Sequence, residues 1–139
     1  MVEQKDKKPR VLVVTPEVTY LPQGMGNGTN NLTAKAGGLA DVSAALISAL
    51  FKQGGDVHVA LPDYRTIFDG NADPVLLKEF KNIKKKMPEN RIHLARDRAF
   101  FYMDTVYSRS SMENIKIALA FQREVINNIV PVVKPDLIH

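Results

Sequence analysis

Residues 10–15 read RVLVVT and residues 56–61 read DVHVAL, and these two short apolar runs decide the fold class. Each run is rich in β-branched residues, and a proline closes each of them, at Pro16 and Pro62. A continuous apolar run of this length is typical of a strand that is buried on both faces of a parallel sheet. Both runs are therefore predicted to be central parallel strands.

Between the two runs, apolar residues recur at intervals of three and four, which predicts an amphipathic helix from Gly38 to Lys52. Lys52 in the last turn and the glycines at 54 and 55 are a typical helix stop. Strand, helix and strand then form one βαβ unit, expected to be right-handed, which places the chain in the α/β class. The core face of the helix is predicted to be the stripe Leu39, Val42, Leu46, Ala49 and Leu50.

Residues 74–107 are expected to be β structure throughout. The segment 75–86 fits either a helix or one arm of a long hairpin, whereas the aromatic-rich segment 98–105 (RAFFYMDT) predicts a strand.

A second clear helix follows, with Ser110 and Glu113 as a capping box and Pro131 as its end. Residues 137–139 (LIH) are expected to open a further buried strand, so that the chain would be a fragment of a longer protein. The predicted core stripe of the helix is Ile115, Ala118, Leu119, Ile126 and Ile129.

The composition excludes several classes of protein. With 45% hydrophobic residues, 139 residues suffice for one domain with a core, and without cysteine neither disulfides nor thiolate metal ligands can form. His58, His93 and His139 lack metal-ligand spacing, so a structural zinc site is not expected. No cofactor is expected either. The apolar run at 11–14 is too short for a signal peptide or a membrane span, which favours a cytoplasmic protein. The basic runs at 5–10 and 78–86 lack interleaved aromatic residues, so solvated surface is favoured over a nucleic-acid site.

The connection between the first strand and its helix is unusually long. It spans residues 16–36, about twenty residues where about 2–6 are typical. Its centre, residues 23–31 (QGMGNGTNN), is rich in Gly and Asn, which tolerate positive φ and offer no anchors to the core. We therefore expect a mobile loop.

The loop ends in residues 35–42 (KAGGLADV), where a strand end meets a helix start. Ligands of open α/β sheets bind at such places, and free backbone N–H groups together with the helix dipole favour an anion. Lys35 would add a mobile positive charge, and Gly37 and Gly38 would let a ligand approach the backbone. Two other roles stay open: the glycines could serve only tight packing of helix on strand, and Asp41 could complement the helix dipole or bind a sugar hydroxyl.

The segments RVLVVTPEV, KAGGLADV and DVHVALPDY resemble the opening of bacterial glycogen synthases and plant starch synthases, and KPDLIH resembles a later strand of that family. The resemblance implies the Rossmann-like N-terminal, acceptor-side domain of a two-Rossmann-domain (GT-B type) glycosyltransferase, truncated, with residues 1–139 as part of it. Such enzymes transfer glucose from ADP-glucose or UDP-glucose to the non-reducing end of an α-1,4-glucan, with retention and without a metal. The C-terminal nucleotide-binding domain would be a necessary partner and is absent here, so the fragment alone would be inactive.

Residue by residue, the resemblance implies that Lys35 contacts the donor phosphates and that Gly37 and Gly38 offer them N–H groups. Asp41 would contact the sugar or order the loop, and Tyr107 would line the donor site. Roles outside the reaction are implied for two further residues: Glu17 would be structural, and His139 would lie in the core or behind the site. The insertion between Glu17 and Lys35 departs from the family pattern. The alternative function is a non-catalytic α/β module that binds a phosphorylated metabolite or nucleotide.

Overall fold

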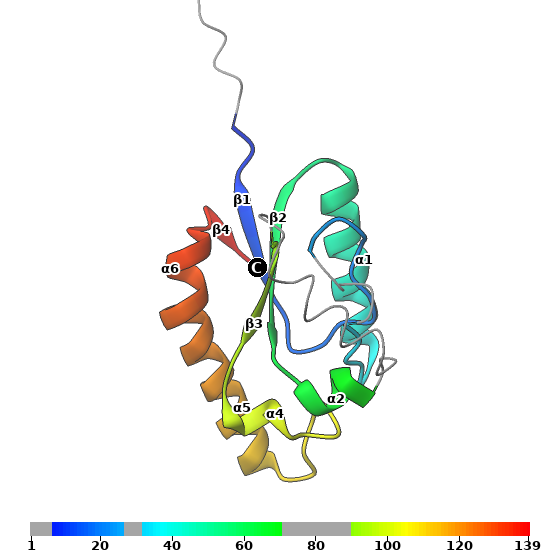
Figure 1. Cartoon of the computed structure of the whole chain (residues 1–139), viewed down its shortest axis with the longest axis vertical. Coiled ribbons are helices and arrows are strands. Elements are labelled where there is room, and N and C mark those ends of the chain that lie inside the picture. The colour runs from blue at the N-terminus through cyan, green and yellow to red at the C-terminus, as the bar shows by residue number, and fades with distance from the viewer. Residues whose placement is uncertain (1–6, 27–31, 71–89) are drawn as a thin grey trace, which may run out of the picture.

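The computed structural model describes residues 7–26, 32–70 and 90–139, and at its centre lies a parallel sheet (Figure 1). The four strands are hydrogen-bonded in the order β3-β2-β1-β4, and every neighbouring pair runs parallel. The predicted α/β fold with a Rossmann-like parallel sheet is thus confirmed. The strands are β1 (Arg10–Val14), β2 (Asp56–Pro62), β3 (Ile92–Ala95) and β4 (Leu137–Ile138).

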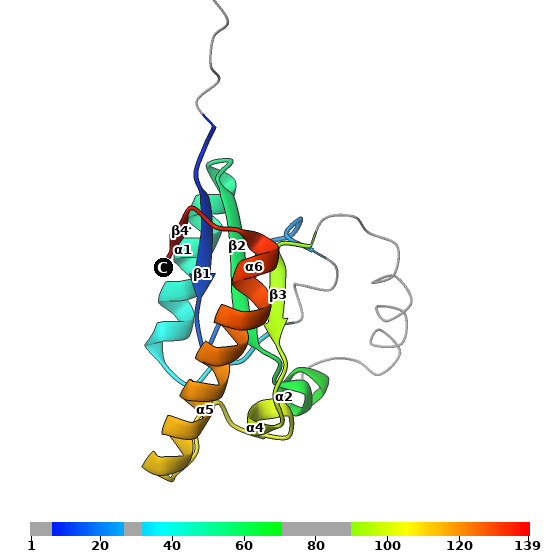
Figure 2. The same ribbon diagram turned by 90° about the vertical axis from the view of Figure 1, so that its left-hand side faces the viewer.

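Helices cover the two faces of this sheet in two layers (Figures 1 and 2). One face carries α1 (Gly38–Lys52), and the opposite face carries a long rod made of three consecutive segments. Two short helices, α2 (Arg65–Gly70) and α4 (Arg98–Phe101), follow the carboxyl ends of β2 and β3. The segments of the rod are α5 (Ser111–Glu124), the π-helical turn η2 (Val125–Ile129) and α6 (Val130–Val133).

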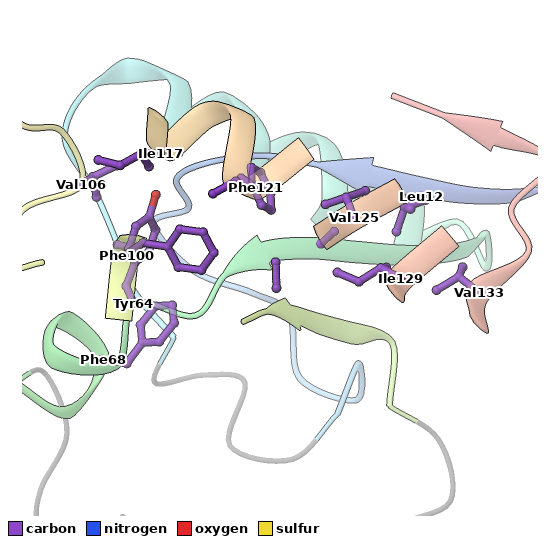
Figure 3. Packing of buried hydrophobic residues seen from close by; sticks show 14 residues of the cluster. Leu12, Tyr64, Phe68, Phe100, Val106, Ile117, Phe121, Val125, Ile129 and Val133 are labelled. Carbon is purple, nitrogen blue, oxygen red and sulfur yellow. The ribbon is translucent and has the colours of Figure 1, made fainter. Parts of the chain in front are cut away.

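Each face of the sheet has its own core, because successive strand residues point to opposite faces. On the α1 side, Val13, Val57 and Val59 pack with Ile47 of the helix. On the other side, Leu12 packs with Phe121, Val125 and other residues of the rod, as Figure 3 shows. Both β1 and β2 are therefore buried on both faces, as their unbroken apolar runs predict.

The bounds of α1 agree with the prediction, but its predicted core face is wrong in part: Leu46 and Leu50 are partly buried, and Leu50 packs against the core, whereas the other three residues of the stripe are exposed. Leu39 and Val42 are 47% and 65% exposed, and the residues that face the sheet are mostly small. Small side chains let the helix lie close to the sheet, and this packing outweighs the larger apolar residues of the predicted stripe. The buried residues are Ala40, Ser43, Ala44, Ile47 and Ser48.

The predicted core stripe of the last helix is also wrong. Ile115, Leu119 and Ile126 are 54%, 60% and 64% exposed, Ala118 is exposed as well, and only Ile129 of that stripe is buried. The helix carries apolar residues on two sides, so a periodicity of 3.6 cannot by itself tell which side meets the sheet. The residues that do so are Ile117, Ala120, Phe121, Val125, Ile129 and Val133.

Pro131 does not end this rod, contrary to the prediction. It lies in the first turn of α6, where the missing N–H of proline is tolerated, and the preceding turn η2 is π-helical. The rod instead ends at Lys134, whose left-handed φ of 50° closes the helix.

The segment 98–105 is not a strand, and residues 74–107 are therefore not β structure throughout. Asp97 accepts a hydrogen bond at 2.8 Å from the N–H of Ala99 and so starts α4, which places Phe100 in the core against Tyr64 and Phe121 (Figure 3). This N-cap and the burial of one aromatic ring outweigh the β-propensity of the others. β3 is the one strand that the structure gives within the described part, residues 90–107, and the segment 75–86 lies outside it.

Two further expectations about burial are corrected. Leu137 and Ile138 form a strand as predicted, but both are more than half exposed, because in the described residues no element covers either side chain. In the long βα loop, Met25 is completely buried and its carbonyl accepts the N–H of Arg91 at 2.8 Å, so the centre of the loop does have a core anchor. Met25 packs with Val18 and Leu21 in the core under α1.

Candidate functional site

The candidate site lies at the carboxyl end of β1. The chain leaves β1 toward α1 on one face of the sheet, whereas the neighbouring β4 is reached from the rod on the opposite face (Figure 1). The strand order reverses at β1, with β2 on one side and β4 on the other, and open α/β sheets bind ligands outside the carboxyl ends of the strands at such a point. Residues 15–20 and 32–42 come together there.

Lys35 and Asp41 form an ion pair at the start of α1. Nζ of Lys35 lies 2.8 Å from Oδ2 of Asp41, and the hydroxyl of Thr19 donates to Oδ1 at 2.6 Å. The hydrogen bonds from Lys35 and Thr19 lower the pKa of the Asp41 carboxyl below its ordinary value. Both charged side chains are about half exposed, so the pair is accessible to a ligand. The sequence pattern drew attention to Lys35 and Asp41 but not to Thr19, which no motif marks.

Gly37 and Gly38 border open space. A Cβ added to either glycine would meet no atom within 4 Å, so tight packing of helix on strand does not explain them. Gly38 is the first residue of α1, where the N–H groups have no partner inside the helix. The open space above an exposed helix N-terminus is what the approach of an anion requires.

The buried carboxylate of Glu17 holds the backbone beside Lys35. Its Oε2 accepts the N–H of Ala36 at 2.7 Å and the N–H of Gly37 at 3.0 Å, and Glu17 is 2% exposed. The Gly37 N–H is therefore engaged inside the protein. Of the two glycines, Gly38 is the one whose N–H is left without an acceptor among the described residues.

Tyr107 joins this arrangement from the segment between α4 and α5. Its hydroxyl donates to Oε1 of Glu17 at 3.3 Å, and burial, together with the neighbouring Glu17 carboxylate, raises the pKa of the phenol. The ring also borders an open cleft of about 670 Å³ whose other lining residues include Arg98, Tyr102 and Arg109. The structure thus brings Tyr107 next to Glu17, although the two residues lie 90 positions apart in the chain.

The remaining candidates are more peripheral. His139 is exposed, and only its backbone is engaged, with N–H and C=O bonded to Leu12 and Val14 of β1.

In residues 7–26, 32–70 and 90–139, no group of three or more His, Asp or Glu side chains is arranged to hold a metal ion. In the same residues, no helix is both long and apolar enough to cross a membrane.

A family model matches nearly the whole chain, and known proteins resemble parts of it. Residues 10–139 match the starch synthase catalytic domain. The glycogen synthase of Moorella thermoacetica is 30% identical over 117 residues, which cover 73% of this chain and 20% of that protein. The glycogen synthase of Nitrosomonas europaea is 40% identical over 74 residues, which cover 53% of this chain and 12% of that protein. No solved structure matches the chain.

The chain therefore spans only a small share, 20%, of the first of these relatives. The family match covers all four strands and every site residue described above, from Glu17 to Tyr107. The motif that resembled glycogen and starch synthases lies at the start of α1, the position at which an α/β sheet binds its ligand. On this combined evidence, the chain belongs to the starch synthase catalytic domain family.

Proposed function

We propose that this chain is the acceptor-side part of a glucan synthase, which transfers glucose from ADP-glucose or UDP-glucose to the non-reducing end of an α-1,4-glucan with retention. The C-terminal nucleotide-binding domain of the whole protein would complete the active site, and transfer would need no metal. The observation that carries the proposal is the Lys35–Asp41 pair beside the open N-terminus of α1, at the carboxyl end of β1. The cytoplasm is the compartment in which such a donor would be available.

Lys35 would neutralise the diphosphate that leaves during transfer. An ammonium group on a flexible side chain can move from the Asp41 carboxylate to a nearby phosphate oxygen without any change in the backbone. The N–H of Gly38 and the positive end of the α1 dipole would add to the same stabilisation. Developing charge on a leaving group is where fixed positive groups contribute most to catalysis.

Asp41 and Tyr107 would act on the donor sugar. Once Lys35 turns to the diphosphate, the Asp41 carboxylate regains a free acceptor for a sugar hydroxyl while Thr19 still fixes its orientation. Tyr107 would line the donor site with its half-exposed ring. Gly37 would contribute its small size, since its N–H already binds Glu17.

The test is Lys35→Ala in the whole protein, with ADP-glucose and UDP-glucose as donors and a maltooligosaccharide as acceptor. Loss of one charge-assisted phosphate contact of about 2 kcal/mol should lower kcat/KM roughly 30-fold. The matched control is Lys52→Ala, an exposed lysine in the last turn of the same helix, which should leave transfer unchanged.

The competing module hypothesis gives a different result. A non-catalytic binding domain would show donor or phosphate binding that depends on Lys35 but no glucosyl transfer by the whole protein under any condition. A change in kcat/KM below about threefold for Lys35→Ala in an active enzyme would contradict the role given to Lys35. The 139-residue chain alone is expected to show negligible transfer, and clear turnover by it would contradict the need for a second domain.

A further inference from the structure

We propose that Glu17 is a positioning residue for the donor: its carboxylate fixes the turn at residues 34–38 (the Lys35 turn) so that Lys35 and the Gly38 N–H face the diphosphate. This inference rests on the function proposed above and adds a residue that does not touch the donor.

The surroundings of the carboxylate are unusual for a buried charge. In the described residues no cation lies within ion-pair distance of Glu17, which is 2% exposed. Three donors offset the cost of burying the charge instead: the N–H groups of Ala36 and Gly37 and the hydroxyl of Tyr107. The hydroxyl of Thr15 holds the Glu17 carbonyl at 2.9 Å, so the backbone of the carboxylate is itself anchored at the end of β1.

Lys35 lies between two fixed points of the backbone. On one side, Ala34 exchanges hydrogen bonds of 2.9 and 3.0 Å with Val18 in an antiparallel bridge. On the other side, Ala36 and Gly37 donate to Glu17. Both anchors point inward, and the one residue between them therefore directs its side chain outward, where it is 46% exposed. Because Gly37 precedes α1 directly, the same contact sets the direction of the first helical N–H groups.

Glu17 also connects the Lys35 turn to a distant segment. Its carboxylate binds Ala36 and Gly37 of the turn and also the hydroxyl of Tyr107, in the segment that precedes α5 and 90 residues from Glu17 in the chain. The carboxylate thus fixes the Lys35 turn relative to the segment that carries Tyr107, and both segments border the proposed donor site.

The opposite role is physically conceivable and makes the opposite prediction. A carboxylate that occupies two N–H groups could act as an internal anion that repels the donor diphosphate. Removal of its charge would then strengthen anion binding, whereas removal of a positioning contact weakens it.

The experiment compares Glu17→Ala, Glu17→Gln and the unchanged chain. Pyrophosphate serves as the probe, and its binding is followed through the backbone amide signals of residues 35–39 in NMR spectra. Glu17→Ala leaves the turn unanchored and should weaken pyrophosphate binding at least fivefold. Glu17→Gln keeps an oxygen in the accepting position and should restore binding to within about twofold.

Amide hydrogen exchange separates positioning from a general effect on stability. In the unchanged chain, the N–H groups of Ala36 and Gly37 should exchange much more slowly than that of Gly38. In Glu17→Ala their exchange should accelerate at least tenfold, while core amides such as those of Leu12 and Val59 keep their rates. Equal rates at Ala36, Gly37 and Gly38 in the unchanged chain would overturn the inference, even if Glu17→Ala did not fold.

Lys35→Ala, measured with the same probe, separates this inference from the proposed function. If Lys35→Ala weakens pyrophosphate binding and Glu17→Ala does not, positioning by Glu17 is wrong while the phosphate site stands. If Lys35→Ala has no effect, the phosphate site itself is wrong. Tighter binding by both Glu17 variants would establish the repulsive role and overturn positioning.

Discussion

At the scale of single residues, a charged cluster at the amino ends of the strands contrasts with the candidate site at the carboxyl ends. Asp56 accepts hydrogen bonds from Arg10 at 2.9 Å and from Arg91 at 2.6 Å, which joins β1, β2 and the start of β3. Nε2 of His58 lies 3.3 Å from the same carboxylate, and Nδ1 of His58 lies 3.0 Å from Nε2 of His93. Burial lowers the pKa of both imidazoles, and that of His93 falls to about 4, helped by the adjacent His58.

This cluster should make the fold sensitive to acid. A lowered pKa in the folded state means that the unfolded chain binds the proton first as the pH falls. The contribution of neutral His93 to the free energy of unfolding is therefore fully present above about pH 6.5 and is lost as the pH falls toward 4. Because the ring is partly exposed, we expect a loss of about 1–2 kcal/mol, below the full equivalent of the shift.

The measurement is urea unfolding at pH 7 and pH 4.5 for the unchanged chain and for His93→Gln, with His139→Gln as an exposed control. His93→Gln should show a smaller drop in unfolding free energy between the two pH values. An equal drop in both proteins would rule out His93 as the source of the acid sensitivity.

At the scale of elements, both long helices begin where their local signals predict and yet turn an unpredicted face to the sheet. Ser110 caps α5 by accepting the N–H of Glu113 at 3.4 Å. The Glu113 carboxylate, however, accepts a hydrogen bond from the hydroxyl of Ser108, so only half of the predicted capping box forms. Phe121 is 7% exposed and packs edge-to-face on Phe100, whereas Leu119, two residues earlier, is 60% exposed. A helix cap depends on neighbouring residues in the chain, whereas the helix face that becomes buried depends on how well each face packs against the sheet.

A pair of substitutions tests which face of α5 is the core. Phe121→Ala should lower the free energy of unfolding by about 3–5 kcal/mol, since it leaves a cavity among Phe100 and its neighbours. Leu119→Ala should change it by less than about 0.5 kcal/mol, because the side chain is already in water. Chemical denaturation at neutral pH measures both values. A larger loss for Leu119→Ala than for Phe121→Ala would restore the face predicted from the sequence.

At the scale of the whole molecule, apolar surface remains uncovered on the rod and on the edge strand β4. The exposed side chains Met112, Ile115, Leu119 and Ile126 lie along the outer face of α5 and η2, and Leu137 and Ile138 lie on the two faces of β4. A helix that is apolar on two sides is typical of one buried in a larger protein, and exposed patches of this kind promote association. The curated relatives are much longer than this chain, which covers 20% of the first of them.

The isolated chain is therefore expected to self-associate at high concentration. Ile115→Lys combined with Leu119→Lys should shift sedimentation velocity profiles toward the monomer, because each lysine replaces an exposed apolar contact with a hydrated charge. Gln122→Lys combined with Asn127→Lys adds the same charge at exposed polar positions of the rod and serves as the control. If the control variant disperses the chain equally well, net charge rather than the apolar face controls association.

Local patterns account for much of the architecture and for the place of the site. β1, β2 and both ends of α1 follow from apolar runs, prolines and glycines, because these signals act within a few residues. The position of Lys35, Gly38 and Asp41 can be predicted in the same way, because these residues follow the first strand in the chain and therefore lie beyond its carboxyl end. Asp97 was missed because a single N-cap carries too little signal to outweigh the three aromatic residues of 98–105, which favour β structure.

The sequence by itself thus determined an α/β chain with a cationic, glycine-lined turn at the end of its first strand. Only the tertiary structure decided which helix faces are buried, because that depends on the fit of each face to a sheet whose paired strand residues lie 33 or more positions apart in the chain. The tertiary structure alone also brought Tyr107 to Glu17 and turned the Glu17 carboxylate onto the Ala36 and Gly37 amides. A buried carboxylate needs hydrogen-bond donors, and the fold brings these from distant parts of the chain, so no pattern of neighbouring residues predicts which donors they are.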